Sequence, residues 1–154
     1  MPGPIDIDQP VAAPAAVVWD LITDIDNAAQ NISGITEVQR LDDGTGFGVG
    51  TRWRETRVMF GRSATEVMAV TEVDPGRSYT TLAEHGSTRY TSSLTVEPTG
   101  PDSCVLSMHF DAEVTGLLNK TLGVVVGKLM ESTTRKLMRQ DLVDIATAAE
   151  RRRS

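Results

Sequence analysis

The chain has 154 residues, of which 40% are hydrophobic and 23% charged, so we expect one globular domain over residues 1–154 rather than a disordered chain. Its net charge of −6 at pH 7 argues against a nucleic-acid partner, which would require basic side chains to neutralise phosphates. Apolar runs are only a few residues long, so we expect no membrane-spanning helix.

The first residues and the cysteine count indicate a cellular location. The opening sequence, MPGPIDID, has neither a cationic start nor an apolar core, so we expect no signal peptide. Cys104 is the single cysteine and cannot form an internal disulfide, which favours a reducing compartment. We therefore expect a cytoplasmic protein.

The first part of the chain predicts one strand followed by two short helices. Residues 5–11, IDIDQPV, alternate between apolar and polar and predict the strand. Residues 15–22, AAVVWDLI, place apolar residues at helical spacing, and Pro14 before them suits the first turn of a helix. Residues 24–31, DIDNAAQN, predict the second short helix.

From Ile35 to Val114 the hydrophobic period is two, which predicts six further strands. The turn compositions DGTGFG, FG, DPG, HGS and PTGPDS separate them, and such short connections join antiparallel neighbours. A long amphipathic helix follows over about residues 117–150 and would be roughly 45–50 Å long. This order of elements predicts an α+β fold in which a twisted antiparallel sheet curls around the last helix.

The turns also predict which residues of neighbouring strands stand opposite each other. We take Phe60-Gly61 and Gly86-Ser87 as two-residue hairpin loops and residues 74–77 as a four-residue loop. The predicted opposite pairs are then Trp53–Met68, Glu55–Glu66, Val73–Ser78, Val70–Thr81, Met68–Ala83, Ala83–Tyr90, Thr81–Ser92 and Tyr79–Leu94.

This register gathers the aromatic residues and most large apolar residues of the strands on one face, while Arg, Thr and Ser dominate the other. The agreement supports the register, because a slip of one residue would exchange the two faces. We expect a ligand to bind against this inner face and the long helix. The predicted ligand-binding residues are Trp53, Glu55, Glu66, Met68, Val70, Tyr79, Thr81, His85, Tyr90, Ser92, Leu94, Met108, Phe110, Val126 and Met130.

Three ionisable residues, Glu55, Glu66 and His85, fall side by side on this inner face, on adjacent strands about 5 Å apart. Such a cluster is either a general acid/base group, the polar end of a ligand pocket, or a solvated ion network at the rim of the sheet. We expect no metal site, because no closely spaced pair of ligands supports one. Nucleophilic chemistry at Cys104 is also not expected, because no His or Asp lies beside it in the register.

The segments PAAVVWDLITDIDN, GVGTRWRETRVMFGR, AVTEVDPGRSYT and GSTRYTSSLTVEP, with the long helix after them, carry a resemblance over residues 5–148. In order and spacing the chain resembles the START-like (SRPBCC) superfamily, in particular its polyketide cyclase/dehydrase and lipid transport group. The resemblance implies a helix-grip fold, in which a seven-stranded curved antiparallel sheet wraps the C-terminal helix and encloses an apolar cavity. It implies neither a cofactor nor a catalytic residue, because the group shares no universal catalytic motif.

Three functions follow from these observations. The first is binding or carriage of one hydrophobic small molecule, such as a lipid or a polyketide, in an internal cavity. The second is a polyketide aromatase/cyclase-dehydrase in which Glu55, Glu66 or His85 moves protons and Tyr79 or Tyr90 orients the substrate. The third is a protein-interaction module, which requires an exposed apolar patch on the outer face of the sheet.

Overall fold

A computed structural model describes residues 4–44, 46–59, 61–85, 88–114 and 120–153, and it describes the side chains of these except at 59, 85, 114, 120–131 and 153. The elements follow in the order β1 (Ile5–Val11), α1 (Ala15–Ile22), the 3-10 helix η1 (Ile25–Asn27), α2 (Ala28–Asn31), β2 (Ile35–Arg40), β3 (Arg52–Met59), β4 (Arg62–Asp74), β5 (Ser78–His85), β6 (Thr88–Gly100), β7 (Ser103–Val114) and α3 (Lys120–Arg153). The predicted α+β order is confirmed, with the second short helix divided into η1 and α2.

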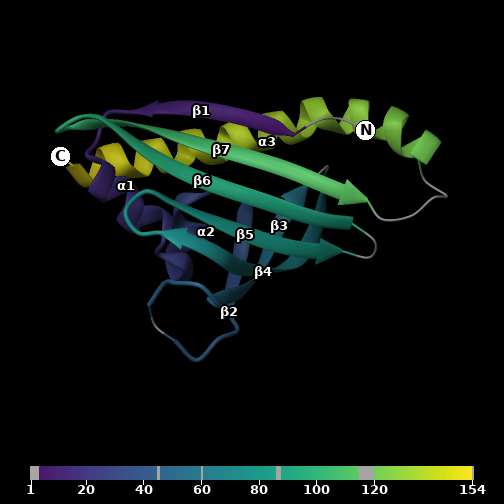
Figure 1. Ribbon diagram of the computed structural model, residues 1–154, viewed down its shortest axis with the longest axis horizontal. Helices are drawn as coiled ribbons and strands as arrows, with labels where there is room; N and C mark the ends of the chain where they lie inside the picture. The colour runs from purple at the N-terminus through teal and green to yellow at the C-terminus, as the bar shows by residue number, and fades with distance from the viewer. Residues whose placement is uncertain (1–3, 45, 60, 86–87, 115–119, 154) are drawn as a thin grey trace.

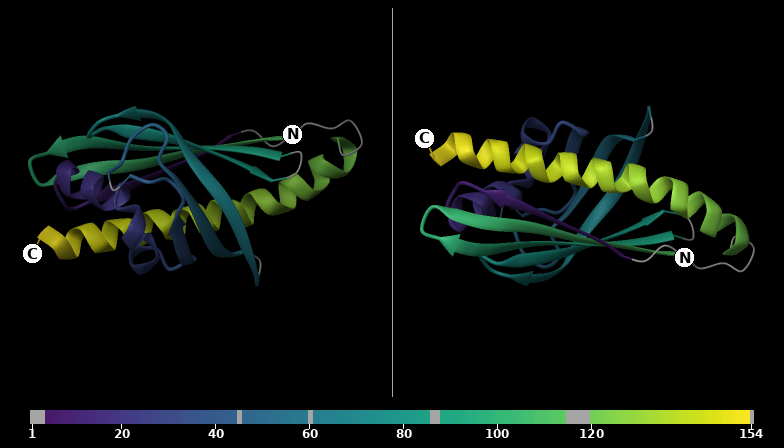
Figure 2. Two further views of the ribbon diagram at one scale, coloured as in Figure 1. Left: turned by 90° about the horizontal axis from the view of Figure 1, so that it is seen from below. Right: turned by 90° about the horizontal axis from the view of Figure 1, so that it is seen from above.

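The seven strands form one sheet in the order β1-β7-β6-β5-β4-β3-β2, and all neighbours are antiparallel (Figure 1). The sheet is strongly curved, so that β2, β3 and β4 swing out of the plane of β1, β7 and β6 and pass beside α3 (Figure 2). α3 packs against β1, β7, α1 and α2. The predicted curved sheet around a long C-terminal helix is therefore confirmed.

Specific residues mark the two ends of the helix α1. Pro14 stands at its N-cap, and the Pro14 carbonyl accepts the backbone N–H of Val17 at 3.0 Å. The helix ends at Ile22, and the hydroxyl of the C-cap residue Thr23 donates to the carbonyl of Trp19 at 2.8 Å. Its apolar stripe, which contains Val18 and Leu21, is buried in the main core.

The predicted register is confirmed at seven of the eight pairs: Trp53–Met68, Glu55–Glu66, Val70–Thr81, Met68–Ala83, Ala83–Tyr90, Thr81–Ser92 and Tyr79–Leu94. The remaining prediction, that Val73 pairs with Ser78, is wrong, because Val73 stands opposite Tyr79. The β4–β5 loop has three residues instead of four, with Gly76 at φ +79°, a conformation that favours glycine.

A β-bulge in β4, between Val70 and Glu72, compensates for the shorter loop. It inserts one extra residue, so the pairs on the Val70 side keep the predicted register. The bulge also turns Val73 to the inner face, where it packs against both hydrophobic clusters of the protein. The error in the predicted register is therefore confined to one end of one hairpin.

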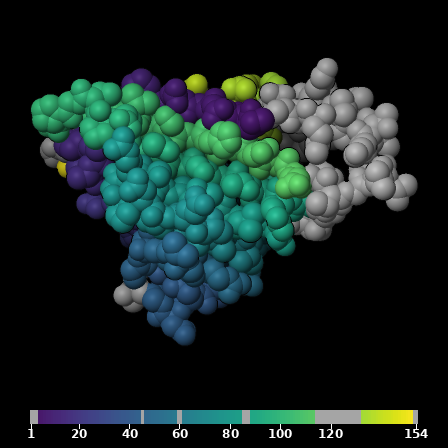
Figure 3. Space-filling model, viewed as in Figure 1, coloured from purple at the N-terminus to yellow at the C-terminus, as the bar shows by residue number. Residues whose placement is uncertain are grey.

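The main hydrophobic core lies at one end of the concave face, between the sheet, α1 and the C-terminal half of α3. Its largest side chains with less than 2% exposure are Leu106, Leu142, Val18, Val96 and Cys104. A second, smaller cluster contains Ile25, Trp53 and Val70. The opposite, convex face of the sheet forms a continuous outer surface (Figure 3).

Polar contacts from α3 also reach the edge strand β1. The Arg139 guanidinium donates to the backbone carbonyl of Asp8 at 2.6 Å, and the Arg135 guanidinium donates to that of Asp6 at 3.4 Å. These contacts occupy carbonyl groups that an edge strand would otherwise present without a partner strand. Within the part of the chain that the structure describes, no helix combines the length and apolar character needed to cross a membrane.

Candidate functional site

The concave face of the sheet changes along its strands from buried to half-buried. Side chains beside α1 and the C-terminal half of α3, such as Val96 and Leu106, have no exposed surface. Farther along the strands lies a group that we call the half-buried patch. Its members are Met68 on β4, Tyr90, Ser92 and Leu94 on β6, and Met108 and Phe110 on β7. The structure thus brings six of the predicted ligand-binding residues together on one inner surface.

Two aromatic rings stack within the half-buried patch. The ring centroids of Tyr90 and Phe110 lie 5.9 Å apart, and the rings are inclined by 24°. Burial and the charge of Glu66 raise the pKa of the Tyr90 phenol more than its hydrogen bond with Thr88 lowers it, so the phenol stays protonated at neutral pH. The patch therefore offers a flat aromatic surface with a hydroxyl at its edge and a carboxylate close by.

Other predicted residues lie around the half-buried patch. Val70, Thr81 and Ala83 are no more than 4% exposed, and Val70 belongs to the smaller cluster. The Thr81 hydroxyl is directed to the backbone carbonyl of Ser92 at 3.5 Å, within the sheet. The side chains of His85, Val126 and Met130 lie outside the described residues.

Trp53, Glu55 and Arg57 on β3 form an internal polar network with Asp141 on α3. The Trp53 indole N–H donates to Glu55 Oε1 at 3.2 Å, and Arg57 Nε donates to Glu55 Oε2 at 2.7 Å. The two terminal nitrogens of Arg57 reach the two carboxylate oxygens of Asp141 at 3.2 and 2.7 Å. The two charged residues beside Trp53 on β3, Glu55 and Arg57, therefore join the sheet to α3.

Electrostatics within the network favour a charged Arg57. Burial alone would lower the pKa of this guanidinium, but the carboxylates of Glu55 and Asp141 outweigh burial and hold the pKa above its usual range. Burial raises the pKa of Asp141, and Arg57 opposes that rise. Asp144, one helical turn farther, accepts hydrogen bonds from the backbone N–H and the hydroxyl of Ser33, which adds a second tie between α3 and the β2 side of the sheet.

The network changes the role that the sequence indicates for Glu55. Its backbone stands opposite Glu66 as predicted. Its two carboxylate oxygens, however, accept hydrogen bonds from Trp53 and Arg57. Asp141 was missed at the sequence level, although one signal was present: it lies next to Leu142 and three residues after Met138, inside the apolar stripe of the helix. An acidic residue in such a stripe requires a partner in the folded protein.

An aromatic cluster of Trp19, Phe47 and Tyr79 closes the buried end of the concave face. The centroid of the Tyr79 ring lies 4.8 Å from that of Phe47 and 6.2 Å from that of Trp19. The Tyr79 hydroxyl donates to the backbone carbonyl of Ile22 at 3.2 Å, and burial raises the pKa of this phenol well above its usual range. The hydroxyl of Tyr79 thus has a protein partner, unlike the ligand contact considered from the sequence.

Residues 5–150 match the sequence profile of the family described as polyketide cyclase / dehydrase and lipid transport. The chain belongs to this family. Among curated proteins, none matches the sequence.

Solved structures of similar fold agree with this family. A START superfamily protein from Mycobacterium smegmatis is 21% identical with a TM-score of 0.70, and the match covers 98% of this chain and 97% of that one. The Zhui aromatase/cyclase from a Streptomyces strain is 19% identical with a TM-score of 0.78, covering 98% and 95%. Norcoclaurine synthase from Thalictrum flavum, solved with dopamine and hydroxybenzaldehyde, is 20% identical with a TM-score of 0.73, covering 98% and 88%. At these identities the likeness shows the helix-grip fold alone.

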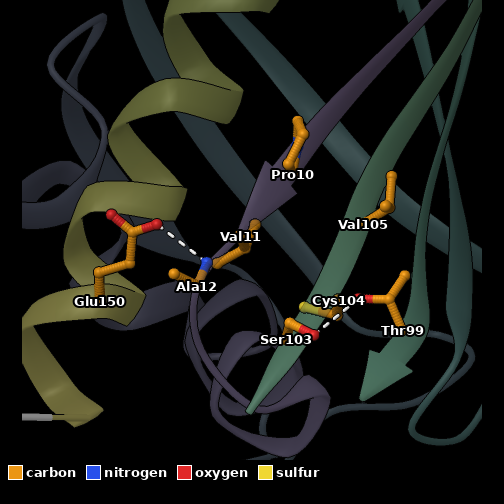
Figure 4. A pocket seen from close by; sticks show the side chains of 8 residues that line it. All are labelled: Pro10, Val11, Ala12, Thr99, Ser103, Cys104, Val105 and Glu150. Carbon is orange, nitrogen blue, oxygen red and sulfur yellow. Dashed lines mark hydrogen bonds between the residues drawn. The ribbon is translucent and has the colours of Figure 1, made fainter.

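A separate groove of about 550 Å³ lies where the end of β1 meets the start of β7 and the end of α3 (Figure 4). At its rim the Ala12 N–H donates to Glu150 Oε2 at 2.9 Å. Cys104 lies against the groove and is 1% exposed, and burial raises the pKa of its thiol, so it stays protonated. None of the residues predicted to bind a ligand lines this groove.

Among the residues that the structure describes, no group of three His, Cys, Asp or Glu side chains is placed to hold a metal ion. The half-buried patch itself consists of apolar, aromatic and hydroxyl side chains.

Proposed function

We propose that the protein binds one hydrophobic small molecule, of the lipid or polyketide class, between the concave face of the sheet and α3. The observation that carries this proposal is the half-buried patch, in which apolar and aromatic side chains on three strands remain partly open beside a fully buried core. Pockets for small ligands combine such an apolar lining with a few polar groups. The family description, which names lipid transport and polyketide cyclases, supports the proposal.

The polar groups of the patch would orient the ligand. Tyr90 and Ser92 offer hydroxyls on β6, and Glu66 lies close to the Tyr90 phenol. We retain His85, Val126 and Met130 as further contacts, as the sequence predicts. The cytoplasmic location also remains part of the proposal, supported by a single, buried cysteine, Cys104.

The proposal is tested with the fluorescent probe 1-anilinonaphthalene-8-sulfonate and a panel of lipids and aromatic polyketides as competitors. We expect the parent protein to bind the probe and Phe110→Ala to bind it about tenfold or more weakly, because burying a phenylalanine side chain contributes about 1.5–3 kcal/mol. Asp111→Ala is the matched control: this next residue on β7 is exposed, and its substitution should leave the affinity unchanged. Failure of the parent to bind the probe and every competitor would refute the proposal.

A second candidate function, polyketide cyclisation and dehydration, is favoured by the Tyr90 phenol on the inner face and by the Glu66 carboxylate, whose charge contributes to the raised pKa of that phenol. A protonated phenol near a carboxylate can orient a carbonyl and accept a proton from the carbon beside it. Two other residues that the sequence indicates for this chemistry contact the protein itself: Glu55 accepts a hydrogen bond from Arg57, and the Tyr79 hydroxyl donates to the carbonyl of Ile22. Glu66→Gln and His85→Ala should change the pH–rate profile for cyclisation of a linear polyketide. Turnover by both variants at the parent rate would contradict this second function.

A further inference from the structure

We propose that Phe47, on the loop between β2 and β3, limits how far a ligand extends along the concave face and thereby selects ligands by length. The inference rests on the proposed binding function and names one determinant of its specificity. Phe47 lies in a segment without helical or strand periodicity, so hydrophobic periodicity does not connect it with the inner face.

Phe47 reaches the inner face at the junction between the two hydrophobic clusters. It packs against both the main core and the smaller cluster of Ile25, Trp53 and Val70. Its ring meets that of Tyr79 edge-on, at 4.8 Å and 67°, and that of Trp19 at 6.4 Å and 86°. The ring of Phe47 therefore covers part of the aromatic wall at the buried end of the concave face.

The half-buried patch continues directly into this covered region. Tyr79 on β5 stands opposite Leu94 on β6, and Leu94 stands opposite Met108 on β7. Leu94 and Met108 belong to the patch, whereas Tyr79 is only 7% exposed. A ligand lying along Met108 and Leu94 would therefore meet Tyr79 next and stop at the ring of Phe47. A smaller side chain at position 47 would extend the accessible apolar surface toward Trp19.

The loop that carries Phe47 is braced on both sides by its own hydrogen bonds (loop between β2 and β3, Figure 1). Before Phe47, Arg40 donates to the carbonyl of Gly46 and also pairs with Asp42. After it, the Gly48 N–H donates to the Thr51 hydroxyl at 3.0 Å. Because these contacts do not involve the phenyl ring, truncation of Phe47 should leave the backbone of the loop and the sheet in place. It should change only how far a ligand can extend.

The test compares the parent, Phe47→Ala and Val49→Ala in the competition of linear saturated fatty acids of increasing length against 1-anilinonaphthalene-8-sulfonate. Val49 is the matched control, since it lies on the same loop but is 69% exposed. We expect the affinity of the parent and of Val49→Ala to stop rising at the same chain length. In Phe47→Ala it should continue to rise, by about fourfold for each further methylene that becomes buried.

Phe47→Leu and Phe47→Trp keep the site apolar and serve if the alanine variant does not fold. The leucine variant should admit longer chains than the parent, and the tryptophan variant should stop at shorter ones. An unchanged limit in the folded Phe47 variants would overturn the inference and leave the proposed function intact. A parent protein that binds neither the probe nor any fatty acid would instead refute the proposed function, and the inference with it.

Discussion

Replacing Arg57 by methionine should destabilise the protein strongly at neutral pH and much less in mild acid. The substitution keeps an apolar stem of similar length but removes the guanidinium between Glu55 and Asp141, whose side chains are only 13% and 10% exposed. Breaking a buried ion pair in this way costs about 3–5 kcal/mol. The network therefore has to release its excess charge, and the simplest way is for Asp141 to bind a proton.

The cost of that proton sets the magnitude and its pH dependence. For a carboxyl with an ordinary pKa of 3.8, protonation in the folded state costs about 4 kcal/mol at pH 7 and about 1.5 kcal/mol at pH 5. The variant adopts whichever state costs less, the unpaired buried charge or the protonated Asp141, so we expect the free energy of unfolding to fall by about 3–4 kcal/mol at pH 7. At pH 5 the loss should fall to about 1.5 kcal/mol, because a protonated Asp141 can donate a hydrogen bond to Glu55.

Urea unfolding at both pH values measures these differences. A loss of 3–4 kcal/mol corresponds to a midpoint lower by about 2 M urea. Arg77→Met is the matched control, because Arg77 pairs with Glu97 at 3.0 Å but both side chains are 56% exposed, and exposed pairs contribute little. The triple variant with Glu55→Gln and Asp141→Asn should regain most of the lost stability. A loss below about 1 kcal/mol at pH 7, or one that does not shrink at pH 5, would refute this account of the network.

Three further predictions concern stability and are measured by urea unfolding. Asp42 accepts hydrogen bonds from Arg40 and from the backbone at Gly44 and Arg52, and these lower its pKa to about 2. Its contribution to the stability of the fold is therefore present above pH 3.8 and is lost as the pH falls through 2. Asp42→Asn should be less stable than the parent at pH 7 but not at the acid limit. Gly76→Ala should cost about 1 kcal/mol through its positive φ, and a neutral effect would contradict the assigned turn. Leu142→Ala, at a site without exposed surface, should cost about 3 kcal/mol, whereas the exposed neighbour Val143→Ala should cost less than about 0.5 kcal/mol. Equal losses would contradict the burial of the Leu142 side of α3.

The fold was largely predictable because each element has a local signal. Alternation with a period of two, interrupted by glycine-rich turns, was sufficient to predict the strands and to place Trp53 opposite Met68, but it did not predict that β1 lies beside β7. The exception, Val73, required two features to be known together, a three-residue loop and a bulge that compensates for it. Neither changes the composition of the segment in a way that distinguishes it from a four-residue loop.

The site was less predictable because its decisive contacts join distant parts of the chain. Asp141 is 84 residues from Arg57, and no local pattern connects them. Phe47 comes from an irregular loop, where hydrophobic periodicity carries no information about direction. The inner face that carries the half-buried patch, by contrast, follows from strand alternation and the lengths of the turns, which is why Tyr90, Leu94 and Phe110 could be assigned to it.

The two arginines of α3 that bond to β1 have a consequence for self-association. An outer strand of a sheet is a template on which a strand from another copy can assemble, and repeated assembly leads to fibres. Here the carbonyls of Asp6 and Asp8 are already bonded to Arg135 and Arg139, so an incoming strand would have to displace charged side chains first. Proteolysis that removes α3 would thus expose both the hydrophobic core and the edge of β1, on which aggregates can assemble. The last helix therefore protects the protein from aggregation as well as packing against its core.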